Sequence, residues 1–197
     1  MKRLPVAVLL VLVVAIGVVM IVVLPRTSRP QPDAAPGQPS QAASTPAPER
    51  KITATLFYVA GDGVSLTPEQ AEVPFGEPVS MQARHIVEAQ IAAPTKGQFS
   101  AIPQGTRLRA LYVNETGDAF VDLTGEIVSG HTGGVLDELF AVYAIVNAIT
   151  VNLPAITRVQ LLIDGKEVDT LAGHVDLRQP LAKNLTWVVQ TKPEEKQ

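Results

Sequence analysis

The chain has 197 residues, 46% of them hydrophobic, a formal net charge of −3 and no cysteine. This length fits one domain with additional segments. The lack of cysteine excludes a disulfide scaffold, a thiolate metal site, a cysteine nucleophile and a lipidated cysteine anchor. The charge is uneven, because residues 1–50 hold five Lys and Arg against two Asp and Glu (+3) and residues 51–197 hold eleven against seventeen (−6). The two parts are expected to face different surroundings.

Residues 1–24 are predicted to form an N-terminal transmembrane helix. The run from Leu4 to Leu24 contains 21 residues and no charged side chain, and a helix of this length spans about 30 Å, the hydrocarbon thickness of a bilayer. A cleavable signal peptide has a shorter apolar region, about 7–15 residues, followed by small residues. Pro25 and Arg26 follow here instead. We expect an uncleaved, single-pass signal anchor with the C-terminal domain outside the cytoplasm, and cleavage is the alternative.

Residues 25–50 are predicted to be a disordered tether. They contain seven prolines among Ala, Gln, Ser and Thr, and almost no large apolar side chain whose burial would offset the ordering of the chain. Such a tether reaches about 30 Å as a flexible coil and about 80 Å when fully extended. It would hold the following domain off the membrane and leave it free to meet partners.

The domain is expected over residues 51–185, with a C-terminal tail at 186–197. Its first strand is predicted at Ile52–Val59, which alternates and then becomes fully apolar. Residues 60–78 are interpreted as a loop, because Gly and Pro are frequent there. A helix over 79–91 follows, with one apolar face, and it ends before a proline. The apolar positions of that helix are Val79, Ala83, Ile86, Val87 and Ile91.

Two short strands, Leu108–Val113 and Ala119–Leu123, are predicted to form a hairpin around Gly117. A long helix is then predicted at Val135–Leu153, where fourteen of nineteen residues are hydrophobic. A second membrane span is not expected, since polar residues interrupt this apolar length. They are Asp137, Glu138, Asn147 and Asn152. We instead expect a helix that is covered on two sides, by its own sheet and by another element or another chain.

The last elements are a strand at Arg158–Ile163, a two-residue turn at Asp164 and Gly165, and a returning strand at 166–168. The order is therefore β-α-β-β-α-β with a terminal hairpin. This order predicts the α+β class, with two helices on one face of a mixed sheet, related to the split βαβ arrangement.

Five sequence motifs follow one another in this domain. They are Ile102–Leu108, Gly117–Leu123, the pair Gly133 and Gly134, Val159–Lys166, and Leu171–Leu177. Their order and spacing resemble the GerMN (sporulation and spore germination) domain over nearly all of residues 52–182. The resemblance implies an extracytoplasmic domain of the bacterial envelope, akin to ring-building modules, that assembles with itself or with other proteins. The protein that names the family has two such domains and a lipidated cysteine, so a general envelope scaffold is expected here.

Three histidines are the first candidates for chemistry. His85 is expected at the edge of the buried face of the helix over 79–91. His131 precedes Gly133 and Gly134, and this loop either presents backbone N–H groups to an anion or turns the chain into the long helix. The spacing matches neither a phosphate loop nor a dinucleotide fingerprint. His174 and Asp176 would share one face of an extended segment, where they either orient a base or metal ligand or fix a loop.

Aspartates give an enzymatic alternative. Asp118 and Asp122 are in phase along one predicted strand, and glycan cleavage uses two carboxyl groups that face one sugar bond. Hairpin geometry explains other acidic residues equally well, such as Asp164. Neither a nucleophile nor a zinc motif accompanies the histidines. We therefore expect no enzymatic activity, no metal and no cofactor, with peptidoglycan binding or hydrolysis as the alternative.

The sequence thus predicts a membrane-tethered extracytoplasmic scaffold or interaction module of the cell envelope. Its expected partners are the bilayer through Leu4–Leu24, envelope proteins or further copies of itself, and peptidoglycan in the alternative. Nucleic acid is not expected, because the domain carries −6 and has no basic cluster. The positions singled out for interaction or motif roles are Gly133, Gly134, Asp164, Gly165, Gly173, His174 and Asp176.

Overall fold

A computed structural model describes residues 50–94 and 97–189 of the chain. The predicted transmembrane segment and residues 25–49 of the predicted tether lie outside the described residues. The elements in chain order are β1 (Lys51–Val59), β2 (Leu66–Pro74), α2 (Val79–Ile91), β3 (Leu108–Val113), β4 (Asp118–Leu123), α3 (Glu126–Ser129), α4 (Val135–Asn152), β5 (Arg158–Ile163), β6 (Lys166–Glu167) and β7 (Leu181–Ala182).

The larger sheet has the strand order β3-β4-β5-β6, with β7 paired to β5. β3 and β4 form the predicted antiparallel hairpin, and β4 and β5 are parallel. Parallel neighbours require a crossover connection, which α3 and α4 supply here. The predicted mixed sheet is therefore present, and its terminal hairpin turns at Asp164 and Gly165, both of which have positive φ.

The first strand does not join this sheet, which corrects the predicted single-sheet arrangement. β1 pairs with β2 along its whole length and forms a separate two-stranded antiparallel sheet. The interpretation of residues 60–78 as a loop is wrong for Leu66–Pro74. Pro68 lies opposite Phe57 and Pro74 lies opposite Lys51, and both prolines occupy positions that face away from β1. A proline there removes no hydrogen bond between the strands.

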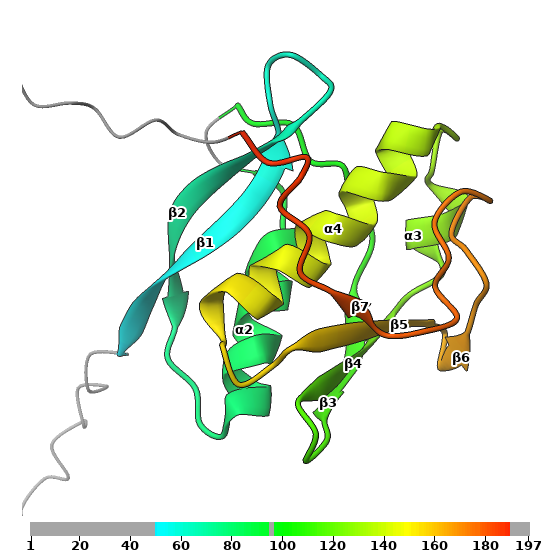
Figure 1. Ribbon diagram of the computed structural model, residues 1–197. Coiled ribbons are helices and arrows are strands. Elements are labelled where there is room, and N and C mark those ends of the chain that lie inside the picture. The colour runs from blue at the N-terminus through cyan, green and yellow to red at the C-terminus, as the bar shows by residue number, and fades with distance from the viewer. Residues whose placement is uncertain (1–49, 95–96, 190–197) are drawn as a thin grey trace, which may run out of the picture. The chain divides into compact units, whose positions relative to one another are not determined.

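The helices α2 and α4 lie between the two sheets (Figure 1). α4 contacts β1 on one side and β5 on the other, so the prediction of a helix covered on two sides is confirmed, and the second cover is an element of the same chain. Among the described residues, α4 is long and apolar enough to span a membrane, yet most of it is buried inside the domain. Most apolar side chains of α4 are therefore covered by other elements of the same domain.

The outer edge of β1 is closed by side chains and backbone of other elements. The amide of Gln90 on α2 accepts from the N–H of Phe57 and donates to its carbonyl, both at 2.8 Å. Asn152 at the end of α4 makes the same pair of bonds with Thr55, also at 2.8 Å. The N–H of Val59 donates to the carbonyl of Phe99. Each outward-facing backbone position from Thr55 to Val59 is thereby paired.

The edge of β2 is closed where it begins. Leu66 donates to the carbonyl of Trp187 and accepts from the N–H of Val189. Residues 187–189, assigned from sequence to the C-terminal tail, therefore lie against the two-stranded sheet. Farther along the strand, Pro68 and Pro74 have no N–H to offer.

Candidate functional site

The first turn of α4 carries a buried carboxylate. Glu138 has no solvent exposure, and its two oxygens bind the loop that follows β6. The N–H of Leu171 donates to Oε1 at 2.8 Å, and the N–H of His174 donates to Oε2 at 2.8 Å. Nδ1 of His174 lies 3.0 Å from the same Oε2. An ionised carboxylate only accepts hydrogen bonds, so Nδ1 carries the hydrogen in this pair.

The loop is shaped around this charge. Burial acts to raise the pKa of Glu138, but hydrogen bonds from the backbone N–H groups of Ala172, His174, Leu171 and Val175 lower that pKa below its ordinary value of 4.5. Gly173 has a φ of +101°, a left-handed conformation that favours glycine. This backbone turns several consecutive N–H groups toward one point. Glu138 is therefore an ionised latch that holds the 171–175 loop on α4.

This contact corrects the pairing expected between His174 and Asp176. His174 binds Glu138 instead, and Asp176 binds Arg178 at 2.9 and 2.7 Å. The Arg178 guanidinium and the Arg178 backbone N–H lower the pKa of Asp176 to about 2. Asp176 is thus an exposed partner of arginine rather than the group that orients His174. Of the two roles considered for His174, the geometry matches the fixing of a loop.

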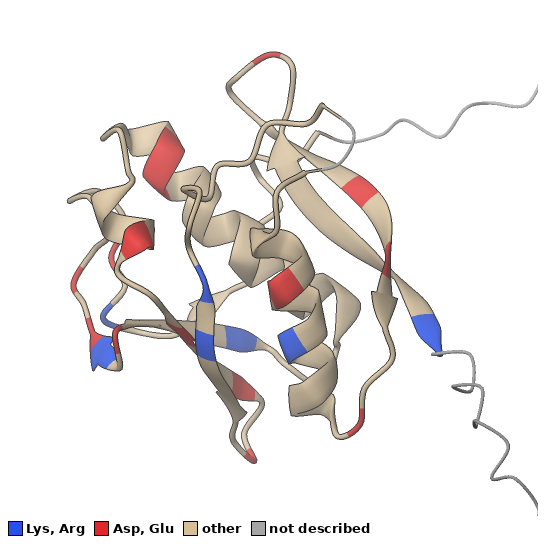
Figure 2. Cartoon of the chain, turned by 180° about the vertical axis from the view of Figure 1, so that it is seen from behind, with Lys and Arg blue, Asp and Glu red and all other residues tan. Residues whose placement is uncertain are grey.

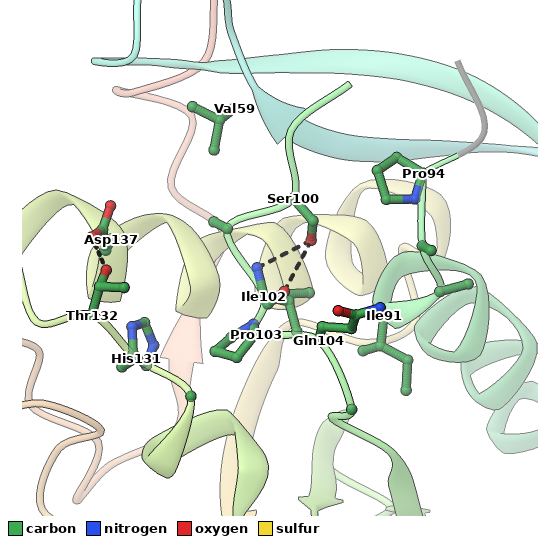
Figure 3. Close-up of a pocket in the computed structure, with 15 residues that line it drawn as sticks. Val59, Ile91, Pro94, Ser100, Ile102, Pro103, Gln104, His131, Thr132 and Asp137 are labelled. Atoms are coloured by element: carbon green, nitrogen blue, oxygen red, sulfur yellow. Dashed lines mark hydrogen bonds between the residues drawn. The ribbon is translucent and has the colours of Figure 1, made fainter. Parts of the chain in front are cut away.

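A pocket opens beside the start of α4, with a volume of about 510 Å³. Figure 3 shows His131, Thr132 and Asp137 on one side of it, Ile91 and Pro94 on the other, and the 100–104 segment between them. Most of the remaining wall is apolar. Thr132 donates to Asp137 at 2.9 Å, and Gly134, rather than a hydroxyl side chain, is the residue at the N-cap of α4. Gly133 has a φ of +79° and lies in the turn that leads into the helix, which is one of the two roles considered for this loop.

The imidazole ring of His131 carries a buried nitrogen that lacks a hydrogen-bond partner. Its Nε2 is buried and has no hydrogen-bond partner among the described residues. Burial lowers the pKa of His131, and the nearby charges of Glu138 and Asp137 only partly oppose that shift. The ring is therefore neutral at pH 7. No lysine or arginine lines the described wall of the pocket, which gives no support to the anion site considered for this loop.

The aspartates of the glycan-cleavage alternative are bound to arginines. Asp118 receives Nε of Arg158 at 2.7 Å, and the hydrogen bond from Arg158 lowers the pKa of Asp118 below its ordinary value. Asp122 receives Nη1 of Arg109 at 2.9 Å and the N–H of Gly165 at 2.8 Å. Figure 2 shows basic and acidic positions near one another on the strands of the mixed sheet. Both carboxylates are buried and serve the sheet and its terminal turn.

The outer face of the mixed sheet, on the side away from the helices, presents aromatic side chains. Tyr112 on β3 lies directly opposite Phe120 on β4, and 65% of Tyr112 is exposed. Leu111, the neighbour of Tyr112, points to the other face and is buried in the core. Because successive side chains of a strand point to opposite faces, the aromatic ring of Tyr112 lies in solvent.

The structure distributes the predicted site residues over separate places. Gly173 and His174 belong to the Glu138 latch, Asp164 and Gly165 to the turn after β5, and Gly133 and Gly134 to the turn that leads into α4. Asp176 stands apart with Arg178. His85, expected at the edge of its helix face, is half-buried there and bonds through Nδ1 with the carbonyl of Pro74 at 3.0 Å.

Glu138 and Tyr112 are the positions that sequence reasoning missed. In the sequence Glu138 stands only as one of the polar residues that interrupt the apolar run, and Tyr112 only as one residue of a predicted strand. The period of β3 carried a usable signal, since Tyr112 stands between two core positions. No local pattern marks Glu138 as buried.

The comparisons with known proteins agree with these elements. The model of the family described as "Germane: Sporulation and spore germination" matches residues 55–169, which is more than half of the chain. The chain belongs to this family. The GerMN resemblance given by the five motifs is thereby confirmed. No curated protein matches the chain.

Two solved structures of GerM, a sporulation protein of Bacillus subtilis, share the GerMN fold with this chain. The first GerMN domain of GerM matches with a TM-score of 0.50 and 18% identity, over 68% of this chain and 96% of that one. The tandem GerMN domains match with a TM-score of 0.51 and 18% identity, over 69% of this chain and 46% of that one. This chain therefore spans about half the length of the tandem protein. At this identity the likeness shows the fold.

Proposed function

We propose that this GerMN-family protein is a membrane-tethered interaction module of the bacterial cell envelope, acting by protein assembly rather than by catalysis. The observation that carries the proposal is the outer face of the mixed sheet, where Tyr112 stands in solvent directly opposite Phe120. An exposed tyrosine beside a half-buried phenylalanine fits a surface that meets another protein. The family membership and the apolar run Leu4–Leu24 support a place in the envelope.

The state of the acidic side chains also supports assembly over glycan hydrolysis. A hydrolase needs one carboxyl group with a raised pKa beside a second one that faces the same sugar bond. Here the pKa of Asp118 is lowered by Arg158, and Asp122 binds Arg109 and the turn at Gly165. Neither carboxyl group is arranged as a proton donor.

A direct experiment separates the two functions. Full-length protein is expressed with Tyr112→Ser, and Val135→Ser serves as a matched control, because Val135 is 57% exposed at the start of α4. Assembly predicts that co-purification with envelope proteins falls for Tyr112→Ser and persists for Val135→Ser. Glycan release that is lost in Asp118→Asn and Asp122→Asn proteins that still fold would instead establish the hydrolase.

Topology is tested on its own. An alkaline phosphatase fused after Arg50 is active only when it is exported, so we expect activity in the fusion. An inactive fusion of normal abundance would place the domain in the cytoplasm and contradict the envelope location.

A second candidate function is the binding of a peptidoglycan fragment in the pocket beside α4. Its volume of about 510 Å³ is in the range of small-molecule sites. His131, whose buried Nε2 has no hydrogen-bond partner among the described residues, lies in its wall. Soluble muropeptides should then shift the ring resonances of His131, while those of His85 serve as an internal control. Unchanged His131 resonances at saturating muropeptide would exclude this candidate.

A further inference from the structure

An open edge of the described part of the domain lies on β3. In the two-stranded sheet, the edge of β1 is closed by Gln90, Asn152 and Phe99, and that of β2 is restricted by prolines and by the 187–189 segment. β3 is the outermost strand of the larger sheet on its side. Unpaired edges are a template for another strand, and proteins normally block them. Because the edge of β1 is closed in this way, the free edge of β3 is a candidate for pairing with another strand.

The pairing of β3 with β4 shows which groups are free. The N–H of Asn114 donates to the carbonyl of Asp118 at 3.0 Å, so Asn114 faces β4. Because antiparallel pairs alternate, Tyr112 also faces β4 through its backbone, and Leu111 and Val113 face away. The outward N–H and carbonyl groups of Leu111 and Val113 have no partner in residues 50–94 and 97–189.

The charges along this edge are polarised. Arg107 and Arg109 lie at its beginning, and Glu115 lies just beyond its end. Glu115 is exposed and forms no ion pair among the described residues, while 41% of the Arg109 side chain is exposed beside Asp122. Two such edges placed antiparallel bring unlike charges together, and a parallel arrangement brings like charges together. The edge is therefore complementary to itself in the antiparallel sense.

We propose that two copies of this chain pair antiparallel through β3, with Leu111 of each copy opposite Val113 of the other. This register uses all four outward backbone groups of each strand. It places Tyr112 directly opposite its counterpart, in a non-hydrogen-bonded pair where side chains approach most closely. It also brings Arg109 of each copy close to Glu115 of the other. The inference rests on the proposed function and names the partner as a second copy.

The contact is small, because one six-residue strand meets another. Such an interface falls in the class of weak and transient contacts, so the dimer is expected to dissociate in dilute solution. Anchoring both copies in one membrane raises their effective concentration and favours pairing without further contacts. The pairing is therefore best captured covalently in the membrane.

The lack of native cysteine allows a clean test with full-length protein in membranes. In the proposed register, Tyr112→Cys places two cysteines about 4.5 Å apart between Cα atoms, inside the range of a disulfide. Ala110→Cys, on the same face of β3, lies four residues out of register with its counterpart, about 13 Å along the strand. Mild oxidation should link Tyr112→Cys chains at least tenfold faster than Ala110→Cys chains. Equal rates, or no dimer for Tyr112→Cys, would overturn the proposal.

The antiparallel charge arrangement has its own test in the Tyr112→Cys protein. Adding Glu115→Arg should slow disulfide formation at least fivefold, because it places like charges across the contact. Adding Glu167→Arg, an exposed change of the same charge on β6, should leave the rate unchanged. Equal slowing by both changes would overturn the proposed register. If Tyr112→Cys chains fail to link while the Tyr112→Ser protein still loses envelope partners, self-pairing is wrong and the proposed function stands.

Discussion

Nδ1 of His174 lies 3.0 Å from Oε2 of Glu138, although 36 residues separate them in the chain. The same carboxylate also accepts the backbone N–H groups of Leu171 and His174. This contact joins the start of α4 to the loop after β6 through one buried charge. The latch therefore ties the long helix to the last part of the mixed sheet.

Replacement of the Glu138 carboxylate should destabilise the domain more than replacement of an exposed acidic residue. Glu138→Gln keeps the shape but places an amide N–H group against backbone donors, so we expect a loss of about 2–3 kcal/mol in the free energy of unfolding. Denaturant unfolding measures this. Asp137→Asn, at the exposed neighbour, should cost less than about 1 kcal/mol. Equal losses for the two variants would contradict the latch.

The latch also predicts a pH dependence. The pKa of Glu138 is lower in the folded domain than its ordinary value of 4.5. A lowered pKa gives stability that is present above the unfolded pKa and is lost as the pH falls through the folded pKa. The stability difference between wild type and Glu138→Gln should therefore shrink below about pH 4.5. A difference that stays constant from pH 7 to pH 3 would show that the carboxylate is not ionised in the fold.

The amide clamps on β1 make a third prediction. Gln90 is fully buried and holds both backbone groups of Phe57. Gln90→Leu keeps the volume but leaves a buried N–H and a carbonyl unpaired, which should cost about 3 kcal/mol and expose the edge to aggregation. Gln104→Leu, an exposed change of the same kind at the pocket, should leave the melting temperature nearly unchanged. A stable Gln90→Leu protein would mean that other groups close the edge.

Positive φ at glycine gives a matched pair of variants. Gly117 and Gly133 have φ of +83° and +79°, but a Cβ on Gly117 would lie 2.7 Å from the backbone carbonyl oxygen of Ala155, and one on Gly133 would meet nothing within 4 Å. Gly133→Ala should cost about 1 kcal/mol for its conformation alone. Gly117→Ala should cost clearly more, at least about 2 kcal/mol. Thermal unfolding measures both losses of stability. Equal losses for Gly117→Ala and Gly133→Ala would contradict the close approach of Gly117 to Ala155.

The elements with strong periodicity were predictable from sequence. The helix at 79–91 and the hairpin of β3 and β4 appear where the apolar pattern places them, because that pattern is local. β2 was missed because Pro68 and Pro74 suggest a loop. Their compatibility with a strand depends on facing away from β1, and that orientation is fixed only by pairing with a distant segment.

The buried polar side chains could not be predicted either, because their burial also depends on distant segments of the chain. Gln90 and Asn152 resemble ordinary helix-surface residues in the sequence, and Glu138 resembles a favourable first-turn acid. Each is buried because a partner far along the chain needs a donor or an acceptor at that point. Burial of a polar side chain is a property of the assembled fold, so the window of residues around it carries no such signal.

One measurement tests the central claim of assembly most directly. A photo-reactive amino acid is placed at position 112 or at position 135 of the full-length protein in its native membrane, and the mass of each adduct is determined. Assembly through the outer face and edge of the mixed sheet predicts an adduct at position 112, with the mass of two copies, and little at position 135. Equal abundance of both proteins with no adduct at position 112 would contradict the account.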